Sequence, residues 1–267
     1  MAEQTLTATW NHRLRSVVSA SRMRRIASLL ILLGAWEVNA QVSQNRLTPS
    51  LAVVAETLID DIVSGELWFH GRLTLFRGFS GLAIALVLGV LVGFAMARSR
   101  WIDAALRPLL NGVYPIPKLA LYPVSILILG FGAASKIGQV GIECFFPIVY
   151  SAYAGAAAID RNMVWLSKNA GASTWRTTRD VVFPAALPSI LTGIRVATPI
   201  MLIVITVTEL LGESRGLGFL IRDAQARFLP ERAIAVVAVL GILGFAFDRL
   251  IVVLTRKLVY WEKGVRL

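Results

Sequence analysis

The chain has 267 residues, of which 56% are apolar and only 16% are charged, and its mean hydropathy is +0.68. This composition excludes an ordinary soluble globular domain and predicts an all-α integral membrane protein. The formal net charge of +11 does not indicate a nucleic-acid-binding protein, because the Lys and Arg residues fall between apolar runs and form no single patch interleaved with aromatic residues. The single cysteine, Cys144, excludes an internal disulfide.

The N-terminal region predicts a basic leader, a first span and an amphipathic helix. Residues 1–25 carry five arginines, and residues 26–42 form a short apolar run interrupted by Trp36 and Glu37. A signal peptide is the alternative for this run, but the long leader and the Trp-Glu pair favour a retained transmembrane anchor. Residues 43–78 follow as a periplasmic region. Within it, residues 47–65 predict an amphipathic helix whose apolar face holds Leu51, Val54, Leu58 and Ile62.

Residues 79–255 form the predicted core domain and contain the other spans. Residues 79–97 are the clearest of these, and the Gly89-x3-Gly93 spacing would let a neighbouring helix approach closely. The third span, between residues 109 and 131, should be kinked or partly unwound because it is rich in proline. Further spans are expected over 137–159, 190–211 and 233–254, with a loop over 212–231, so the chain should have about six transmembrane helices.

The longest polar interval after residue 137 is the stretch 160–190. Gly171 suits a tight turn after a first helix, and Ser173 suits the N-cap of a second, short helix. Pro184 and Pro188 follow before the next span. The pattern predicts two short helices joined by a hairpin turn on the membrane surface, a shape suited to docking a partner.

The distribution of positive charge predicts the orientation of the chain. Of the 27 Lys and Arg residues, 19 lie in the segments 1–25, 98–118, 159–195 and 249–267. The positive-inside rule places these segments in the cytoplasm, together with both termini and the tail over 256–267. We therefore expect a multi-pass protein of the bacterial inner membrane.

The hairpin segment resembles a known motif. Gly171, nine further residues and then Val181-x-Phe183-Pro184 resemble the cytoplasmic loop of permease subunits of ATP-binding-cassette (ABC) importers, whose pattern is E-A-A-x3-G-x9-I-x-L-P. The resemblance runs from about residue 79 to 261. The stretches GAS, PAALPSILTGIR and GLGFLI are similar to the branch that handles sulfonates, nitrate and taurine. The sequence departs from the pattern at its start, where E-A-A is replaced by Trp165, Leu166 and Ser167.

The resemblance implies a fold, partners and docking residues. The fold would be that of a type I ABC importer permease, paired with a second permease copy, cytoplasmic ATPase subunits and a periplasmic solute-binding protein that touches residues 51–63 and 212–231. The residues that would dock the ATPase are Trp165, Lys168, Ala170, Gly171, Ala172, Ser173, Trp175 and Arg176. The sequence has no G-x4-G-K-[ST] phosphate loop, so ATP and Mg²⁺ would bind the partner ATPase, and this chain would be no enzyme and hold no cofactor.

Ionisable residues within the spans are candidates for a solute path, because they are costly to bury in lipid. Glu143 is the deepest, Glu209 lies at the end of a span, and Asp248 is expected to pair with Arg249 or to lie near the cytoplasmic surface. A small anionic solute would be repelled by carboxylates, so the proline breaks around Tyr114 to Lys118 offer a second candidate contact. A self-sufficient secondary transporter or channel, and a membrane scaffold without a path, remain the alternatives.

Overall fold

The computed structural model describes residues 23–24, 26–43 and 47–261. Nearly all of the predicted leader, and the last six residues of the predicted tail, lie outside this part of the chain. In the described part, five helices are long and apolar enough to cross a membrane, or six if one bent pair counts as a single span. This confirms the expectation of an all-helical membrane protein with about six spans.

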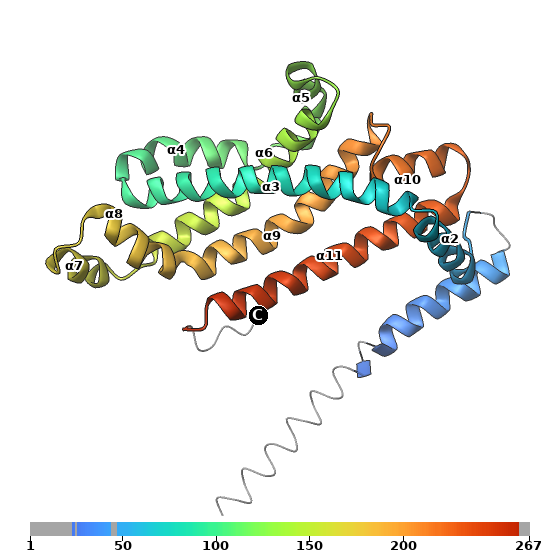
Figure 1. The fold of residues 1–267 in the computed structure, drawn as a ribbon, viewed down its shortest axis with the longest axis horizontal. Helices are drawn as coiled ribbons and strands as arrows, with labels where there is room; N and C mark the ends of the chain where they lie inside the picture. The colour runs from blue at the N-terminus through green and yellow to red at the C-terminus, as the bar shows by residue number, and fades with distance from the viewer. Residues whose placement is uncertain (1–22, 25, 44–46, 262–267) are drawn as a thin grey trace, which may run out of the picture.

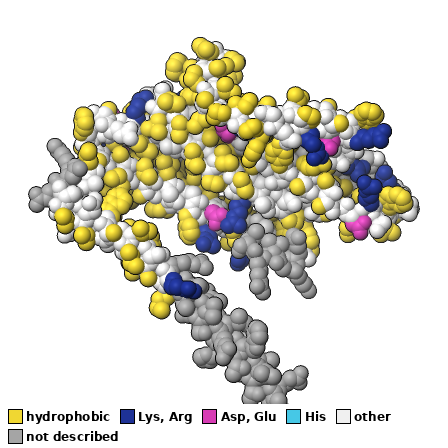
Figure 2. Space-filling model, turned by 180° about the vertical axis from the view of Figure 1, so that it is seen from behind, with side chains coloured by type: hydrophobic (Ala, Val, Ile, Leu, Met, Phe, Trp, Pro, Cys, Tyr) yellow, Lys and Arg dark blue, Asp and Glu magenta, His cyan; other side chains and the backbone are white. Residues whose placement is uncertain are grey.

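Four long helices form the body of the molecule. They are α3 (Glu66–Arg98), α6 (Ala133–Ala157), α9 (Phe183–Leu210) and α11 (Pro230–Leu258), and they run along its long axis (Figure 1). The short helices α7 (Arg161–Asn169) and α8 (Thr174–Thr177) lie at one end, and α2 (Leu51–Val63) and α10 (Leu217–Ala226) lie at the other. Figure 2 shows hydrophobic side chains over most of one face, with Lys and Arg gathered at the end that carries α7 and α8.

The first helix (Ile26–Ser43) leaves the body and buries none of its apolar window (Figure 1). Two hydrogen bonds join it to the start of α2. The Glu37 carboxylate accepts the Leu51 N–H at 2.8 Å, and the Trp36 indole N–H donates to the Pro49 carbonyl at 3.0 Å. Glu37 therefore anchors a helix to its neighbour.

The most extensive helix contact lies between α3 and α6. Gly81, Ala85, Gly89 and Gly93 follow at intervals of four along α3 and are all buried. A Cβ at Gly93 would lie 2.7 Å from the Val149 carbonyl oxygen, and one at Gly89 would lie 2.8 Å from an Ile148 methyl group. The close approach predicted from the glycine spacing is confirmed, because a side chain at these positions would push the two backbones apart.

Helix α3 begins at Glu66, well before the span predicted to start at residue 79. The added turns contain the polar residues His70, Thr74 and Arg77, which lower the local hydropathy and so obscured the start of the helix. All three are buried, because they bind partners from distant parts of the chain.

The predicted break in the third span is confirmed. Helix α4 (Arg100–Val113) is followed by a 3-10 turn, η1 (Lys118–Leu121), and by α5 (Tyr122–Leu129), and the two helical parts meet at 85°. Pro115 and Pro117 fall in the gap, where their missing N–H groups cannot continue the helix. Helix α5 projects from the body and leaves Leu127 and Ile128 exposed (Figure 1).

Two other expectations need correction. The prolines do not separate the second short helix from the next span, because a π-helical turn, η2 (Thr178–Val182), joins α8 directly to α9. The loop expected over 212–231 contains α10, whose face formed by Leu217, Leu220, Ile221 and Ala224 is buried.

The amphipathic helix predicted over 47–65 is present as α2, but its buried face differs from the predicted one. Val54 is buried as expected, whereas Ile62 is exposed. Asp61 is buried in its place, because its carboxylate pairs with Arg232 of α11 at 2.9 Å. Leu51 and Leu58 are half-buried, so the predicted face differs from the observed one only in the last turn.

Candidate functional site

The hairpin between α7 and α8 is built by local backbone chemistry. Gly171 has a φ of +80°, a conformation that glycine adopts without a steric penalty. The Ala172 N–H donates to the Ser167 carbonyl at 3.0 Å and the Gly171 N–H to the Lys168 carbonyl at 2.9 Å, which is the Schellman arrangement that ends a helix. Ser173 then caps α8 by accepting the Arg176 N–H at 3.3 Å. The predicted turn and N-cap are both confirmed.

One side-chain contact fixes the two short helices to each other. The hydroxyl groups of Ser167 and Thr177 lie 3.0 Å apart, and Thr177 is fully buried. Ser167 occupies the third position of the replaced E-A-A triplet, so this position faces the inside of the hairpin. A Cβ at Gly171 would meet no atom within 4 Å, so the glycine is needed for its φ angle and not for space.

The outside of the hairpin carries exposed hydrophobic side chains. Trp165 and Leu166 are each 68% exposed, and Trp175 is 74% exposed. The other predicted docking residues, Lys168, Ala170, Gly171, Ser173 and Arg176, are also exposed, and Ala172 is half-buried. Exposed aromatic side chains at the basic end of the molecule are typical of a surface that a partner covers.

Tyr114 and Glu143, two of the predicted path residues, meet around a third residue. Lys118 begins the turn after the broken span and is buried, and its ammonium lies 3.7 Å from the Glu143 carboxylate. The ammonium also lies over the rings of Phe146, at 4.5 Å, and of Tyr114, at 5.5 Å. The structure therefore brings together a lysine, a carboxylate and two aromatic rings where the helix is interrupted.

The backbone at this break is held by polar side chains. The Lys118 ammonium donates to the carbonyls of Tyr114 at 3.1 Å and Ile116 at 3.3 Å. Gln139 of α6 donates to the Lys118 carbonyl at 2.8 Å and accepts from Ser125 at 3.0 Å. These bonds satisfy backbone groups that the missing helical turn leaves free, and they fix Lys118 against α6.

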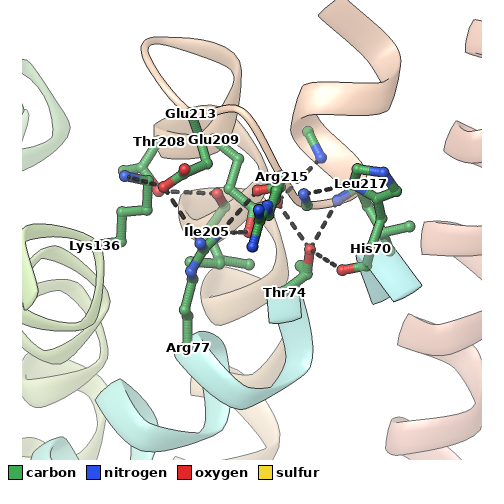
Figure 3. Close-up of polar contacts among 12 residues, drawn as sticks. His70, Thr74, Arg77, Lys136, Ile205, Thr208, Glu209, Glu213, Arg215 and Leu217 are labelled. Atoms are coloured by element: carbon green, nitrogen blue, oxygen red, sulfur yellow. Dashed lines mark hydrogen bonds and ion pairs between the residues drawn. The ribbon is translucent and has the colours of Figure 1, made fainter. Parts of the chain in front are cut away.

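Glu209, the third predicted path residue, lies elsewhere. Its side chain is fully buried near the end of α9 and accepts three hydrogen bonds (Figure 3). They come from Thr74 at 2.8 Å, from Arg77 at 2.9 Å and from the Gly218 N–H at 3.1 Å. A Cβ at Gly216 or Gly218 would overlap the space that Glu209 occupies, so both glycines make room for it.

The loop between α9 and α10 is tied into the same network (Figure 3). The Gly216 N–H donates to His70 Nδ1 at 2.8 Å, and the Arg215 carbonyl accepts from Arg77 at 2.9 Å. Glu213 pairs with Lys136 of α6 at 2.8 Å and with Arg77 at 3.3 Å. Partial burial opposes ionisation of Glu213, but the hydrogen bonds from Lys136 and the Ser214 N–H and the charges of Lys136 and Arg77 lower its pKa on balance.

The expected contact between Asp248 and Arg249 is wrong. Asp248 pairs with Arg195 of α9 at 2.7 Å, while Arg249 lies over the Phe245 ring. Neighbouring residues on a helix point in different directions, so the pair forms across the α9–α11 contact.

The sequence does not single out Arg77, Thr74 and His70 as site residues. Lys118 lies at the end of the candidate stretch Tyr114 to Lys118, but the positive-inside count also includes its charge in the cytoplasmic segment 98–118. The signal that distinguishes it is its position inside a stretch expected to span the membrane, directly before the apolar run over 119–129. Arg77 lies just before the predicted start of its span, and only its distant partners reveal its role.

Solved structures share this fold. The protein in "Inward facing conformations of the MetNI methionine ABC transporter: CY5 native crystal form" matches with a TM-score of 0.58 and 19% identity, over 72% of this chain and 94% of that one. An amino acid ABC transporter crystallised with histidines matches with a TM-score of 0.58 and 17% identity, over 76% and 94%.

Curated relatives match most of the sequence. The putative aliphatic sulfonates transport permease protein SsuC of Bacillus subtilis is 28% identical over 88% of this chain and 86% of its own length. The taurine transport system permease protein TauC of Escherichia coli is 29% identical over 90% of both chains. The formylaminopyrimidine transport permease protein ThiX of Halalkalibacterium halodurans is 34% identical over 81% of this chain and 88% of its own.

The family described as the binding-protein-dependent transport system inner membrane component matches residues 85–260, a range that runs from the glycine-lined seam of α3 to the end of α11. It includes the hairpin, the broken span and Glu209. The chain therefore belongs to the binding-protein-dependent transport system inner membrane components, the permease subunits of ABC importers.

Proposed function

We propose that this permease subunit moves a small anionic solute of the sulfonate, taurine or nitrate type across the inner membrane by alternating access, driven by a separate ATPase. The exposed surface of the α7–α8 hairpin carries the proposal. Three large hydrophobic side chains stand on a rigidly closed turn at the basic end of the molecule, where a cytoplasmic partner would cover them. The names of the sulfonate and taurine relatives support the solute class.

The remaining parts of the importer follow from this arrangement. ATP and Mg²⁺ would bind the partner ATPase, and this chain would supply no catalytic group. A second permease copy would complete the path. The solute-binding protein would contact the opposite end of the molecule, formed by α2 and α10. The charge bias along the sequence supports a cytoplasmic position for both termini and for the hairpin.

Among the predicted path residues, Tyr114 and Glu143 are proposed to line the path. Glu209 is fully enclosed by protein groups, so we propose that it shapes one end of the path by holding the α9–α10 loop. A self-sufficient secondary transporter or channel is disfavoured by membership of a family that works with an ATPase and a binding protein.

The docking role can be tested by comparing two glycines. Gly171 and Gly65 have φ angles of +80° and +79°, and a Cβ at either would meet no atom within 4 Å. Gly171→Val and Gly65→Val should therefore cost similar folding free energy, about 1–3 kcal/mol, through backbone strain alone. We expect only Gly171→Val to lose capture of the ATPase subunit and ATP-driven uptake, while both variants insert into the membrane.

The large side chains give a second test that involves no backbone strain. Trp165→Ala and Trp175→Ala should each weaken ATPase capture at least about tenfold, since each removes an exposed anchor of about 1.4 kcal/mol or more. Unchanged capture and uptake in Gly171→Val and in both tryptophan variants would refute the docking surface. Uptake by the permease alone, driven by an ion gradient, would instead favour the secondary transporter.

A further inference from the structure

The charged pair of Lys118 and Glu143 lies deep within the membrane part of the chain. Glu143 is ten residues from the start of α6 and fourteen from its end, which places it about 15 Å along a helix rising 1.5 Å per residue. The hydrocarbon core is about 30 Å thick, so the pair lies near its middle. Ionisable groups at this depth are expensive to bury and mark solute paths more often than they stabilise a fold.

The pair is loosely bonded. An ammonium group has three N–H donors, and two of those on Lys118 are used by backbone carbonyls. Besides its contacts with the two aromatic rings, the ammonium interacts with Glu143 at 3.7 Å, which is longer than a hydrogen bond. Among the described residues no hydrogen bond ends on the Glu143 carboxylate. Each charge therefore keeps capacity for another partner.

The opposite charges of Lys118 and Glu143 determine which class of solute can bind both residues. A simple anion bound to Lys118 would compete with Glu143 and leave the carboxylate without a counter-charge, which costs several kcal/mol away from water. A zwitterion avoids this cost, because its anionic group can pair with Lys118 while its protonated amine pairs with Glu143. The net charge of the site is then zero before and after binding.

The aromatic rings favour the same class of solute. Phe146 and Tyr114 already present their faces to the Lys118 ammonium. Aromatic rings beside a carboxylate are a surface that an ammonium group favours, and Glu143 lies next to these rings. Tyr114 is more than half exposed.

We propose that Lys118 and Glu143 form a binding site for a zwitterionic solute in the path, with Lys118 contacting its anionic group and Glu143 its protonated amine. This inference rests on the proposed importer function and narrows its solute class from an anion to an amine-bearing anion. It also assigns the two charges opposite and complementary roles.

The test compares solutes that differ only in the amine. Binding of taurine and ethanesulfonate, and of β-alanine and propionate, is measured on the complete permease–ATPase complex in lipid nanodiscs without the solute-binding protein. We expect at least one zwitterion to bind about tenfold or more tightly than its amine-free analogue, a difference of about 1.4 kcal/mol. Glu143→Gln should bring the two members of that pair to within about twofold, and Lys118→Gln should lose both.

Asp103→Asn is the matched control, because it also converts a carboxylate to an amide but pairs with Arg107 on α4, away from the site. Its solute preference should equal that of the unmodified chain. Tighter binding of the amine-free members, no saturable binding of either zwitterion, or an unchanged preference in Glu143→Gln would each overturn the inference. The proposed function fails separately, if Gly171→Val and the tryptophan variants still capture the ATPase.

Discussion

The carboxylates of Glu209 and Glu143 both lie within long membrane helices, but their hydrogen bonding differs. Glu209 accepts hydrogen bonds from a hydroxyl, a guanidinium and a backbone N–H, all within 3.1 Å. Glu143 has one cation at 3.7 Å and, among the described residues, no hydrogen bond. A carboxylate whose hydrogen-bonding capacity is filled by protein groups holds helices and loops together. A carboxylate whose hydrogen-bonding capacity is unfilled is available to a ligand. Depth in the membrane alone does not separate the two roles.

The same substitution at both sites should give the largest contrast. Glu209→Gln leaves Arg77 buried without its full counter-charge and should cost about 3–5 kcal/mol of unfolding free energy. Glu143→Gln should cost less than Glu209→Gln, because Lys118 keeps its two carbonyl acceptors and, among the described residues, no hydrogen bond to the Glu143 carboxylate is lost. Denaturant unfolding of the purified protein measures both, and equal losses would show that the two carboxylates do the same work.

The close contact between α3 and α6 should affect both the Glu209 network and the Lys118–Glu143 pair. Helix α3 carries Thr74 and Arg77, and α6 carries Lys136 and Glu143. Gly93→Ala places a Cβ 2.7 Å from the Val149 carbonyl oxygen and should cost about 1–3 kcal/mol by forcing the helices apart. Gly241→Ala on α11 is the control, because a Cβ there meets nothing within 4 Å. The unfolding temperature should fall only in Gly93→Ala. An equal fall in both variants would contradict the close packing of α3 against α6.

The smallest expected effect is a pH dependence of stability, and it concerns only the network that contains Glu209 and Glu213. The folded-state pKa of Glu213 is lowered, so its ion pair adds stability above the unfolded value of about 4.3 and loses it as pH falls through the folded pKa. Glu213→Gln should therefore lower the unfolding temperature at pH 7, and the difference from the unmodified chain should shrink at acid pH. A constant difference across that range would argue against an ionised Glu213.

Features that depend on local chemistry were predictable from the sequence. The Gly171 turn, the Ser173 cap, the proline break and the glycine spacing each act through neighbouring residues or through a repeat along one helix. Features that depend on distant partners were not. Arg77 meets Glu209 across more than a hundred residues of chain. Local hydropathy cannot reveal that this buried arginine is neutralised, which is why the sequence pattern predicts too late a start for α3.

Lys118 shows how the two kinds of information combine. Its charge is visible in the sequence, where it falls both in the cytoplasmic segment 98–118 of the positive-inside count and inside the third span predicted between residues 109 and 131. Only the fold places its ammonium over Phe146 and beside Glu143. A lysine within a proline-broken span is therefore better interpreted as a site candidate than as an indicator of orientation.

The π-helical turn at Thr178–Val182 has a mechanical consequence. It lets the helical backbone continue from Thr174 to Leu210, a run of 37 residues whose length along the helix is about 55 Å. One end of this helical run is the proposed docking surface, and the other end holds Glu209. A tilt of only about 5° imposed at the hairpin would swing the far tip by about 5 Å, roughly one helical turn.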